Sequence, residues 1–85
     1  MWEKALFTLQ VKAFRVESEA EKFMDELDEA WPELPTRIIG GMSNSRPIYR
    51  VMLGAFKDRS SATEIKNQFV TRFGKVDRPF IKSLR

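Results

Sequence analysis

The sequence Val11-Lys12-Ala13-Phe14-Arg15 has a counterpart 42 residues later in Leu53-Gly54-Ala55-Phe56-Lys57. The match extends into the segments that follow, where Ser18, Ala20 and Phe23 align with Ser60, Ala62 and Ile65. In each half an alternating strand leads through an Ala-Phe turn into an amphipathic helix. The chain is therefore expected to fold as two equivalent halves.

The hydrophobic periodicity predicts four strands and two helices. The strands are expected at residues 6–13, 36–39, 48–53 and 80–84, with a polar loop over residues 40–47 between the second and third. The first helix is expected to start with a capping box of Ser18 and Glu21 and to end before Pro32, and the second to stop at Gly74.

The resulting order is βαββαβ, which places the chain in the α+β class. Right-handed crossovers then give a ferredoxin-like, or RNP-like, four-stranded antiparallel sheet with both helices on one face. The other face is left open to solvent or to a ligand. We expect a single domain over residues 5–84, with residues 1–4 as an N-terminal extension.

The composition excludes several kinds of chemistry. Among 85 residues there is neither cysteine nor histidine. A zinc site with nitrogen or sulfur ligands, a thiolate nucleophile and an imidazole base are therefore impossible. The paired carboxylates, such as Asp25 and Glu29, are expected on an exposed helix face, where nothing desolvates them. The sequence thus predicts a protein that is not an enzyme, with no catalytic residues, no metal and no cofactor.

The charges are distributed unevenly along the chain. Residues 17–33 hold eight acids and one base, a local charge of −7, whereas the formal charge of the whole chain is +3. The acids fall between apolar residues at helical spacing and are interpreted as the solvated face of the first helix. The rest of the chain is then free to present its cations to an acidic partner. No apolar run approaches the ~20 residues that cross a bilayer, so membrane contact is expected only through an anchor in a longer parent chain.

Period-two alternation predicts which side chains occupy the open face. Leu9, Val11 and Ala13 are expected to face the helices in the first strand, as are Tyr49, Val51 and Leu53 in the third. The open face would then carry hydrogen-bonding, cationic and apolar groups: Thr8, Gln10, Lys12, Ile48, Arg50 and Met52. Exposed apolar side chains such as Ile48 and Met52 often mark a contact surface.

These motifs resemble the SPOR domain family, whose members typically show Gln-Val-Gly-Ala-Phe in the first half and Tyr-Arg-Val-x-Val-Gly-Pro-Phe in the second. The present chain has Gln10-Val11-Lys12-Ala13-Phe14 and Tyr49-Arg50-Val51-Met52-Leu53-Gly54-Ala55-Phe56, and the resemblance extends to Pro79-Phe80-Ile81. Lys12 replaces the usual Gly and Ala55 the usual Pro.

The resemblance implies a non-catalytic module of the bacterial cell envelope or periplasm. Such a module binds septal peptidoglycan and prefers glycan strands without stem peptides, which lie across the exposed sheet face. Other division proteins are possible further partners. By position, Gln10 matches the Gln of the first motif, Ile48 precedes the Tyr of the second, and Lys12 would place a cation at the edge of the groove.

Two alternatives share the βαββαβ order. An RRM-like domain would bind single-stranded RNA, and the basic sequence pI of about 9.5 suits that ligand. RRM sheets, however, present aromatic rings on the first and third strands, and the residues expected on the open face include none; nucleic acid is therefore not an expected partner. The second alternative is a ferredoxin-like regulatory or protein-interaction domain.

Overall fold

The computed structural model describes residues 2–74 and 79–84. A short 3-10 helix, η1 (Trp2–Lys4), precedes the βαββαβ series. The series consists of β1 (Phe7–Phe14), α1 (Glu17–Ala30), β2 (Thr36–Ser43), β3 (Arg46–Phe56), α2 (Arg59–Phe73) and β4 (Phe80–Ser83). The predicted element order and fold class are confirmed.

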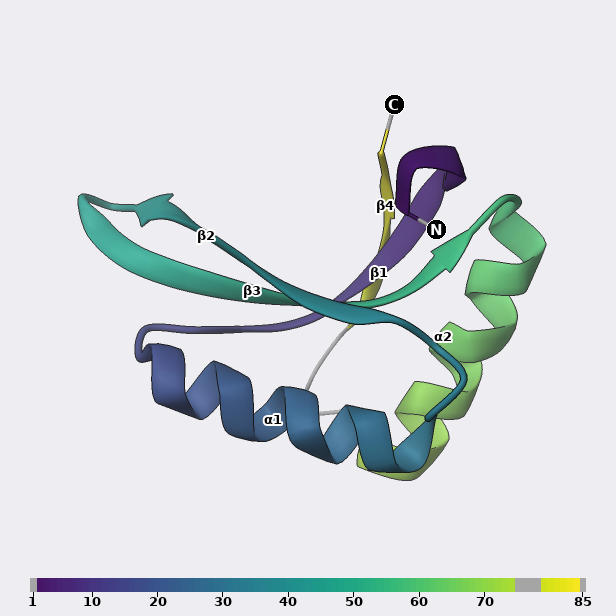
Figure 1. Ribbon diagram of the computed structural model, residues 1–85, viewed down its shortest axis with the longest axis horizontal. Helices are drawn as coiled ribbons and strands as arrows, with labels where there is room; N and C mark the ends of the chain where they lie inside the picture. The colour runs from purple at the N-terminus through teal and green to yellow at the C-terminus, as the bar shows by residue number, and fades with distance from the viewer. Residues whose placement is uncertain (1, 75–78, 85) are drawn as a thin grey trace.

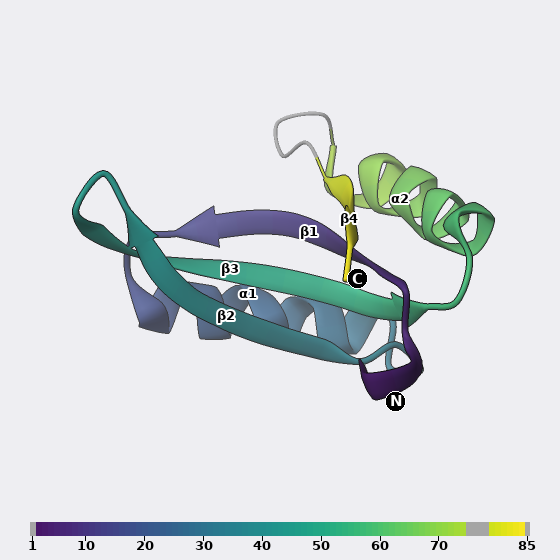
Figure 2. The same ribbon diagram turned by 90° about the horizontal axis from the view of Figure 1, so that it is seen from above.

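The four strands form one antiparallel sheet in the order β2-β3-β1-β4. Both helices pack on the same side of the twisted sheet; in Figure 1, α1 lies below the sheet and α2 at its right. Figure 2 shows the strands from the other side, with α1 behind them. The hydrophobic core fills the space between the sheet and the helices, and the opposite face of the sheet carries no helix.

The core joins the inward side chains of the central strands to both helices. Leu9, Val51 and Leu53 are fully buried against Phe23 of α1 and Phe69 of α2. The rings of α1, α2 and Trp31 form a continuous aromatic cluster in which the Phe69 and Phe73 centroids are 4.9 Å apart. Each buried aromatic or aliphatic side chain contributes about 1.5–3 kcal/mol to folding, so this cluster fixes the helices on one face.

The two helices start at equivalent positions with different chemistry. The N-cap residues are Val16 and Asp58, which are 42 residues apart, as the internal repeat predicts. Val16 makes no side-chain cap, so the predicted capping box at Ser18 is wrong; α1 begins two residues earlier, with acids in its first turn. α2 ends at Gly74, whose φ of 85° confirms the predicted stop.

The second and third strands are longer than predicted. Residues 40–47 do not form a loop: β2 and β3 continue through them and are joined by Asn44 and Ser45 alone. Both residues have positive φ, 54° and 63°, as a two-residue type I′ hairpin turn requires. The glycines and Pro47 obscured this strand in the sequence. Pro47 is tolerated because β1 pairs with β3 only as far as Tyr49, leaving β2 as the one neighbouring strand at Pro47.

A β-bulge interrupts the alternation of β1. Gln10 pairs with Met52 and Lys12 with Val51, so two residues of β1 span the distance of one residue on β3. Val11 and Lys12 consequently both face the helices, and Ala13 turns to the opposite side. The prediction that Ala13 faces the helices is therefore wrong.

Candidate binding face

The side of the sheet opposite the helices is here called the open face. The strand register assigns its residues, because directly paired residues of an antiparallel sheet point to the same side. One row crosses all four strands and consists of Phe80, Gln10, Met52 and Arg37. The next row consists of Ala13, Arg50 and Ile39, and beyond it Ile48 pairs with Gly41 and Arg46 with Ser43.

The open face is cationic. It carries Arg37, Arg46, Arg50 and, opposite Thr8 on β4, Lys82. No acid is found among the residues that the described strands direct to this side. The acids of α1 lie on the other side of the molecule, since α1 packs below the sheet (Figure 1). An anionic ligand would therefore be attracted to the open face and repelled by α1.

Three of the predicted site residues lie together on the accessible part of this face. Gln10, Ile48 and Arg50 are each partly exposed, and they come from the two central strands. The arrangement brings an amide, an apolar side chain and a guanidinium onto one surface. Their role in binding remains a prediction.

Met52 points to the open face but is completely buried, with 0% of its surface exposed. It lies on a central strand between two long neighbours, Gln10 and Arg37. The prediction of an exposed Met52 is wrong for this reason: alternation indicates the side of a sheet, but not what covers a residue there. Met52 forms part of the floor of the face and is not a contact surface.

Thr8 is also fully buried, which corrects the prediction that it is available to a ligand. Its hydroxyl donates a hydrogen bond of 2.6 Å to the carbonyl oxygen of Gly54. Gly54 has a φ of 81° and lies where the β1–β3 register shifts a second time. Thr8 thus stabilises an irregular part of β3 from the neighbouring strand.

Lys12 lies on the helix side of the sheet, which contradicts its predicted place at the groove. The bulge turns its side chain toward α1, where Nζ lies 5.2 Å from the ring centroid of Phe14 and 5.5 Å from that of Phe23. The Lys that replaces the usual Gly therefore covers core rings and does not touch the open face.

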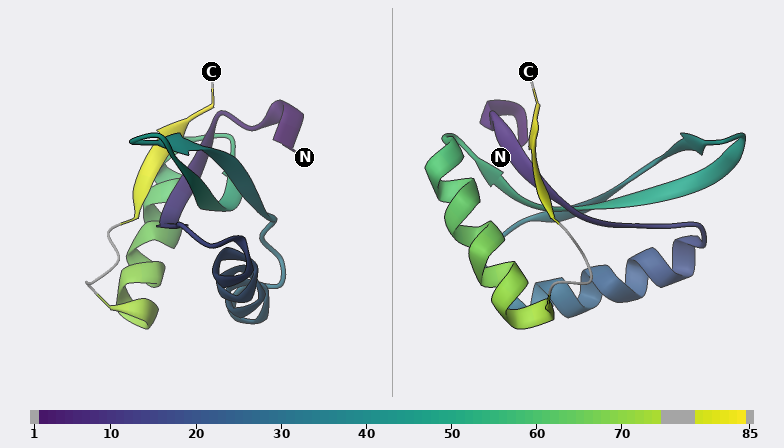
Figure 3. Two further views of the ribbon diagram at one scale, coloured as in Figure 1. Left: turned by 90° about the vertical axis from the view of Figure 1, so that its left-hand side faces the viewer. Right: turned by 180° about the vertical axis from the view of Figure 1, so that it is seen from behind.

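The N-terminal segment covers one end of the open face. η1 lies on the side of the sheet away from the helices (Figure 3). The guanidinium carbon of Arg37 lies 4.4 Å from the ring centroid of Trp2, so the Arg37 side chain attaches η1 to β2. The accessible part of the face therefore extends from Phe80 and Gln10 toward the β2–β3 hairpin.

The sequence analysis missed several residues of the face, above all Phe80. Its side chain is 49% exposed and is the direct neighbour of Gln10. Ile39 and Gly41 of β2 flank Arg50. The strand order and register would have revealed these positions, but the extent of β2 was not evident from residues 40–47.

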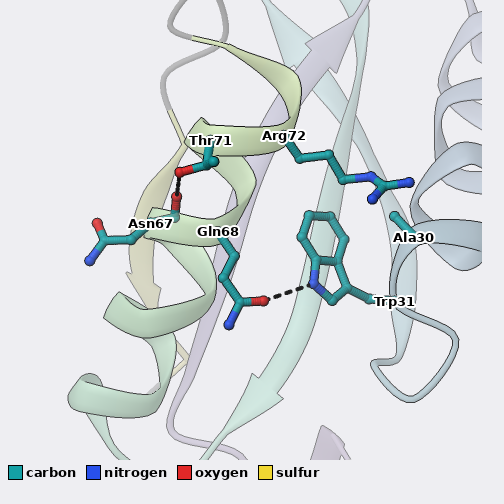
Figure 4. A pocket seen from close by; sticks show the side chains of 6 residues that line it. All are labelled: Ala30, Trp31, Asn67, Gln68, Thr71 and Arg72. Carbon is teal, nitrogen blue, oxygen red and sulfur yellow. Dashed lines mark hydrogen bonds between the residues drawn. The ribbon is translucent and has the colours of Figure 1, made fainter.

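A separate groove lies on the helix side, between the end of α1 and α2. It has a volume of about 360 Å³ and is lined by Ala30, Trp31, Asn67, Gln68, Thr71 and Arg72. Trp31 donates its indole N–H to Oε1 of Gln68 over 3.2 Å, and Arg72 extends toward Ala30 (Figure 4). Trp31 is buried and its indole N–H already has a hydrogen-bond partner. The groove is therefore a weaker candidate for a ligand-binding site than the open face.

The described residues contain no cluster of acids that could hold a metal ion. Within the same ranges, no helix has the length and apolar composition needed to cross a bilayer. The fold and the face together define an α+β domain that offers one uncovered, cationic sheet surface.

The chain belongs to the SPOR domain family, whose family model matches residues 3–76. Its fold is similar to that of the RlpA SPOR domain from Pseudomonas aeruginosa, with a TM-score of 0.76 and 21% identity over 89% of this chain and 96% of that one. It is also similar to the peptidoglycan binding domain of the B. subtilis cell wall lytic enzyme CwlC, with a TM-score of 0.70 and 15% identity over 95% of this chain and 91% of that one. No curated protein sequence matches the chain.

Proposed function

We propose that this SPOR domain is a non-catalytic module that binds peptidoglycan through its open face. The ligand would be glycan strands without stem peptides. Membership of the SPOR family supports the proposal, as does the similarity to a domain whose name describes it as peptidoglycan binding. The cell envelope or periplasm, at the division septum, would be the place of action, with membrane attachment through a parent chain and other division proteins as further partners.

The observation that carries the proposal is the chemistry of the open face. A glycan strand offers acetamides and hydroxyls to the Gln10 amide, and apolar sugar faces and methyl groups to Ile48 and to the half-exposed Phe80 ring. Each N-acetylmuramic acid without a peptide adds a lactyl carboxylate, which matches a face on which the described strands carry arginines and no acids. A shallow contact surface of this kind predicts a Kd in the micromolar range, about −8 kcal/mol or weaker.

Co-sedimentation with purified sacculi, before and after amidase digestion, tests this function. We expect digestion to increase the fraction of protein that pellets. Gln10→Ala and Ile48→Ala should each reduce pelleting about 3- to 10-fold, because each removes one partly exposed contact. Asn67→Ala on the exposed side of α2 is the matched control and should pellet like the wild type.

Two outcomes contradict the proposal. One is equal pelleting with digested and undigested sacculi. The other is stronger binding to poly-uridine than to sacculi, which would favour the RNA-binding alternative. The open faces of β1 and β3 carry no aromatic ring, and the ring of Phe80 belongs to β4, so we expect the poly-uridine arm to show little binding.

A further inference from the structure

The guanidinium of Arg50 lies across the backbone of the neighbouring strand at Gly41. A Cβ atom at position 41 would be only 2.9 Å from Nη1 of Arg50. Gly41 pairs with Ile48, so it is the diagonal neighbour of Arg50 on the open face. The missing side chain of Gly41 thus leaves the space that the guanidinium occupies.

The backbone does not require glycine at this position. Gly54 and Gly74 have positive φ, whereas Gly40 and Gly41 do not. An alanine at position 41 would therefore be compatible with the strand and would conflict only with the end of the Arg50 side chain. The feature that Gly41 provides is room for the guanidinium.

Arg50 is held in place while its hydrogen-bond donors stay available. Its cross-strand neighbours are Ala13 and Ile39, which offer apolar contact and no side-chain acceptor. Among residues 2–74 and 79–84, the guanidinium of Arg50 has no hydrogen-bond or ion-pair partner. It is half-buried, so its charge is partly desolvated and interacts more strongly with an anion than a fully solvated arginine would.

We propose that Arg50, positioned by Gly41, is the residue that selects glycan strands with free lactyl carboxylates. A planar guanidinium lying on the sheet can donate two parallel hydrogen bonds to a carboxylate. The same carboxylate converted to an amide, as when a stem peptide is attached, has lost its charge and one of its two acceptor oxygens. Gly41 acts as a positioning residue and Arg50 as the specificity residue. This inference rests on the proposed function. It assigns the domain's preference for glycan strands without stem peptides to Arg50 and Gly41.

The test compares two forms of one synthetic muramyl oligosaccharide, with lactyl carboxylates either free or converted to methylamides. Isothermal titration calorimetry gives the Kd of each form for the wild type and the variants. We expect the wild type to bind the free acid about 10-fold more tightly or better, the usual effect of a charge-assisted hydrogen bond. Arg50→Gln should remove this preference by weakening only the free acid, and Arg50→Lys should restore part of it.

Gly41→Ala should reduce the preference several-fold without weakening the methylamide form. Gly40→Ala is the matched control: it lies on the same strand but on the helix side, and its Cβ would be an ordinary 3.9 Å from the ring of Tyr49. Both alanine variants should unfold at or above the wild-type temperature, because the displaced group at position 41 is the end of a flexible side chain. In the Arg50→Gln background, Gly41→Ala should have no further effect on either Kd.

The outcomes separate this inference from the proposed function. If the wild type binds both forms equally, or if Arg50→Gln weakens both forms equally, Arg50 is not the selective residue, although the domain still binds glycan. If Gly41→Ala and Gly40→Ala behave alike, Gly41 has no positioning role. If neither form binds at all, the proposed function itself fails.

Discussion

At the scale of single residues, a side chain that points to the open face is not always accessible to a ligand. Gln10, Met52 and Thr8 all point to the open face, but only Gln10 is exposed there. Alternation predicted the side correctly for these three residues. The exposure depends on neighbours contributed by distant segments, such as Arg37 for Met52, and these were not evident from the strand itself.

Thr8 is a structural residue, and its substitution should affect stability but not binding. Thr8→Val removes the hydroxyl that donates to the Gly54 carbonyl and should lower the free energy of unfolding by about 1–2 kcal/mol. Urea denaturation measures this loss, and the Kd for glycan should stay at the wild-type value because the side chain is fully buried. Thr63→Val, on the exposed surface of α2, is the control. A weaker Kd with unchanged stability would show that Thr8 contacts the ligand.

At the scale of elements, the sequence predicted the order and number of strands and helices, since long periodic segments determine them. The predictions failed where a local irregularity is fixed by pairing. The bulge at Val11 and Lys12 reverses the sides of the following residues, and it is set by the register against β3. The Asn44-Ser45 turn extends β2 into a segment whose glycines favoured a loop. Along β1, the side of the sheet was accordingly predicted correctly for Thr8 and Gln10, before the bulge, and wrongly for Lys12 and Ala13, after it.

The start of α2 gives a pH-dependent prediction. The backbone N–H of Ser61 and the hydroxyl of Ser60 donate to the Asp58 carboxylate and lower its pKa below the ordinary value of 3.8. The ionised form is favoured in the folded state, so the cap stabilises the protein fully above pH 3.8 and less as the pH falls through the lowered pKa.

Asp58→Ala should therefore lower the melting temperature at neutral pH. The difference from the wild type should shrink below pH 3.8, as thermal unfolding followed by circular dichroism across pH 2–7 would measure. Ser18→Ala is the control, because Ser18 does not cap α1 and its substitution should show no such pH-dependent difference. A gap between Asp58→Ala and the wild type that stays constant down to the lowest pH would contradict the capping role.

At the scale of the whole molecule, the fold places the acidic helix α1 and the arginines of the open face on opposite sides of the sheet. The acids of residues 17–33 lie with α1 below the sheet, and arginines occupy the opposite face. The net charge of +3 thus conceals an acidic helix and a cationic sheet face, while further bases such as Arg59, Lys66 and Arg72 belong to α2. This separation was partly evident from the sequence, but the placement of Arg37, Arg46 and Arg50 on one face emerged only from the strand register.

The most direct test of a glycan site on the open face is a chemical-shift titration of the ¹⁵N-labelled domain with a peptide-free muramyl oligosaccharide. We expect the backbone amides of Gln10, Ile48, Arg50 and Phe80 to shift, while those of Asn67 and Thr71 at the α1–α2 groove remain unchanged. Shifts concentrated around Trp31 and Arg72, with the open face unaffected, would contradict the account.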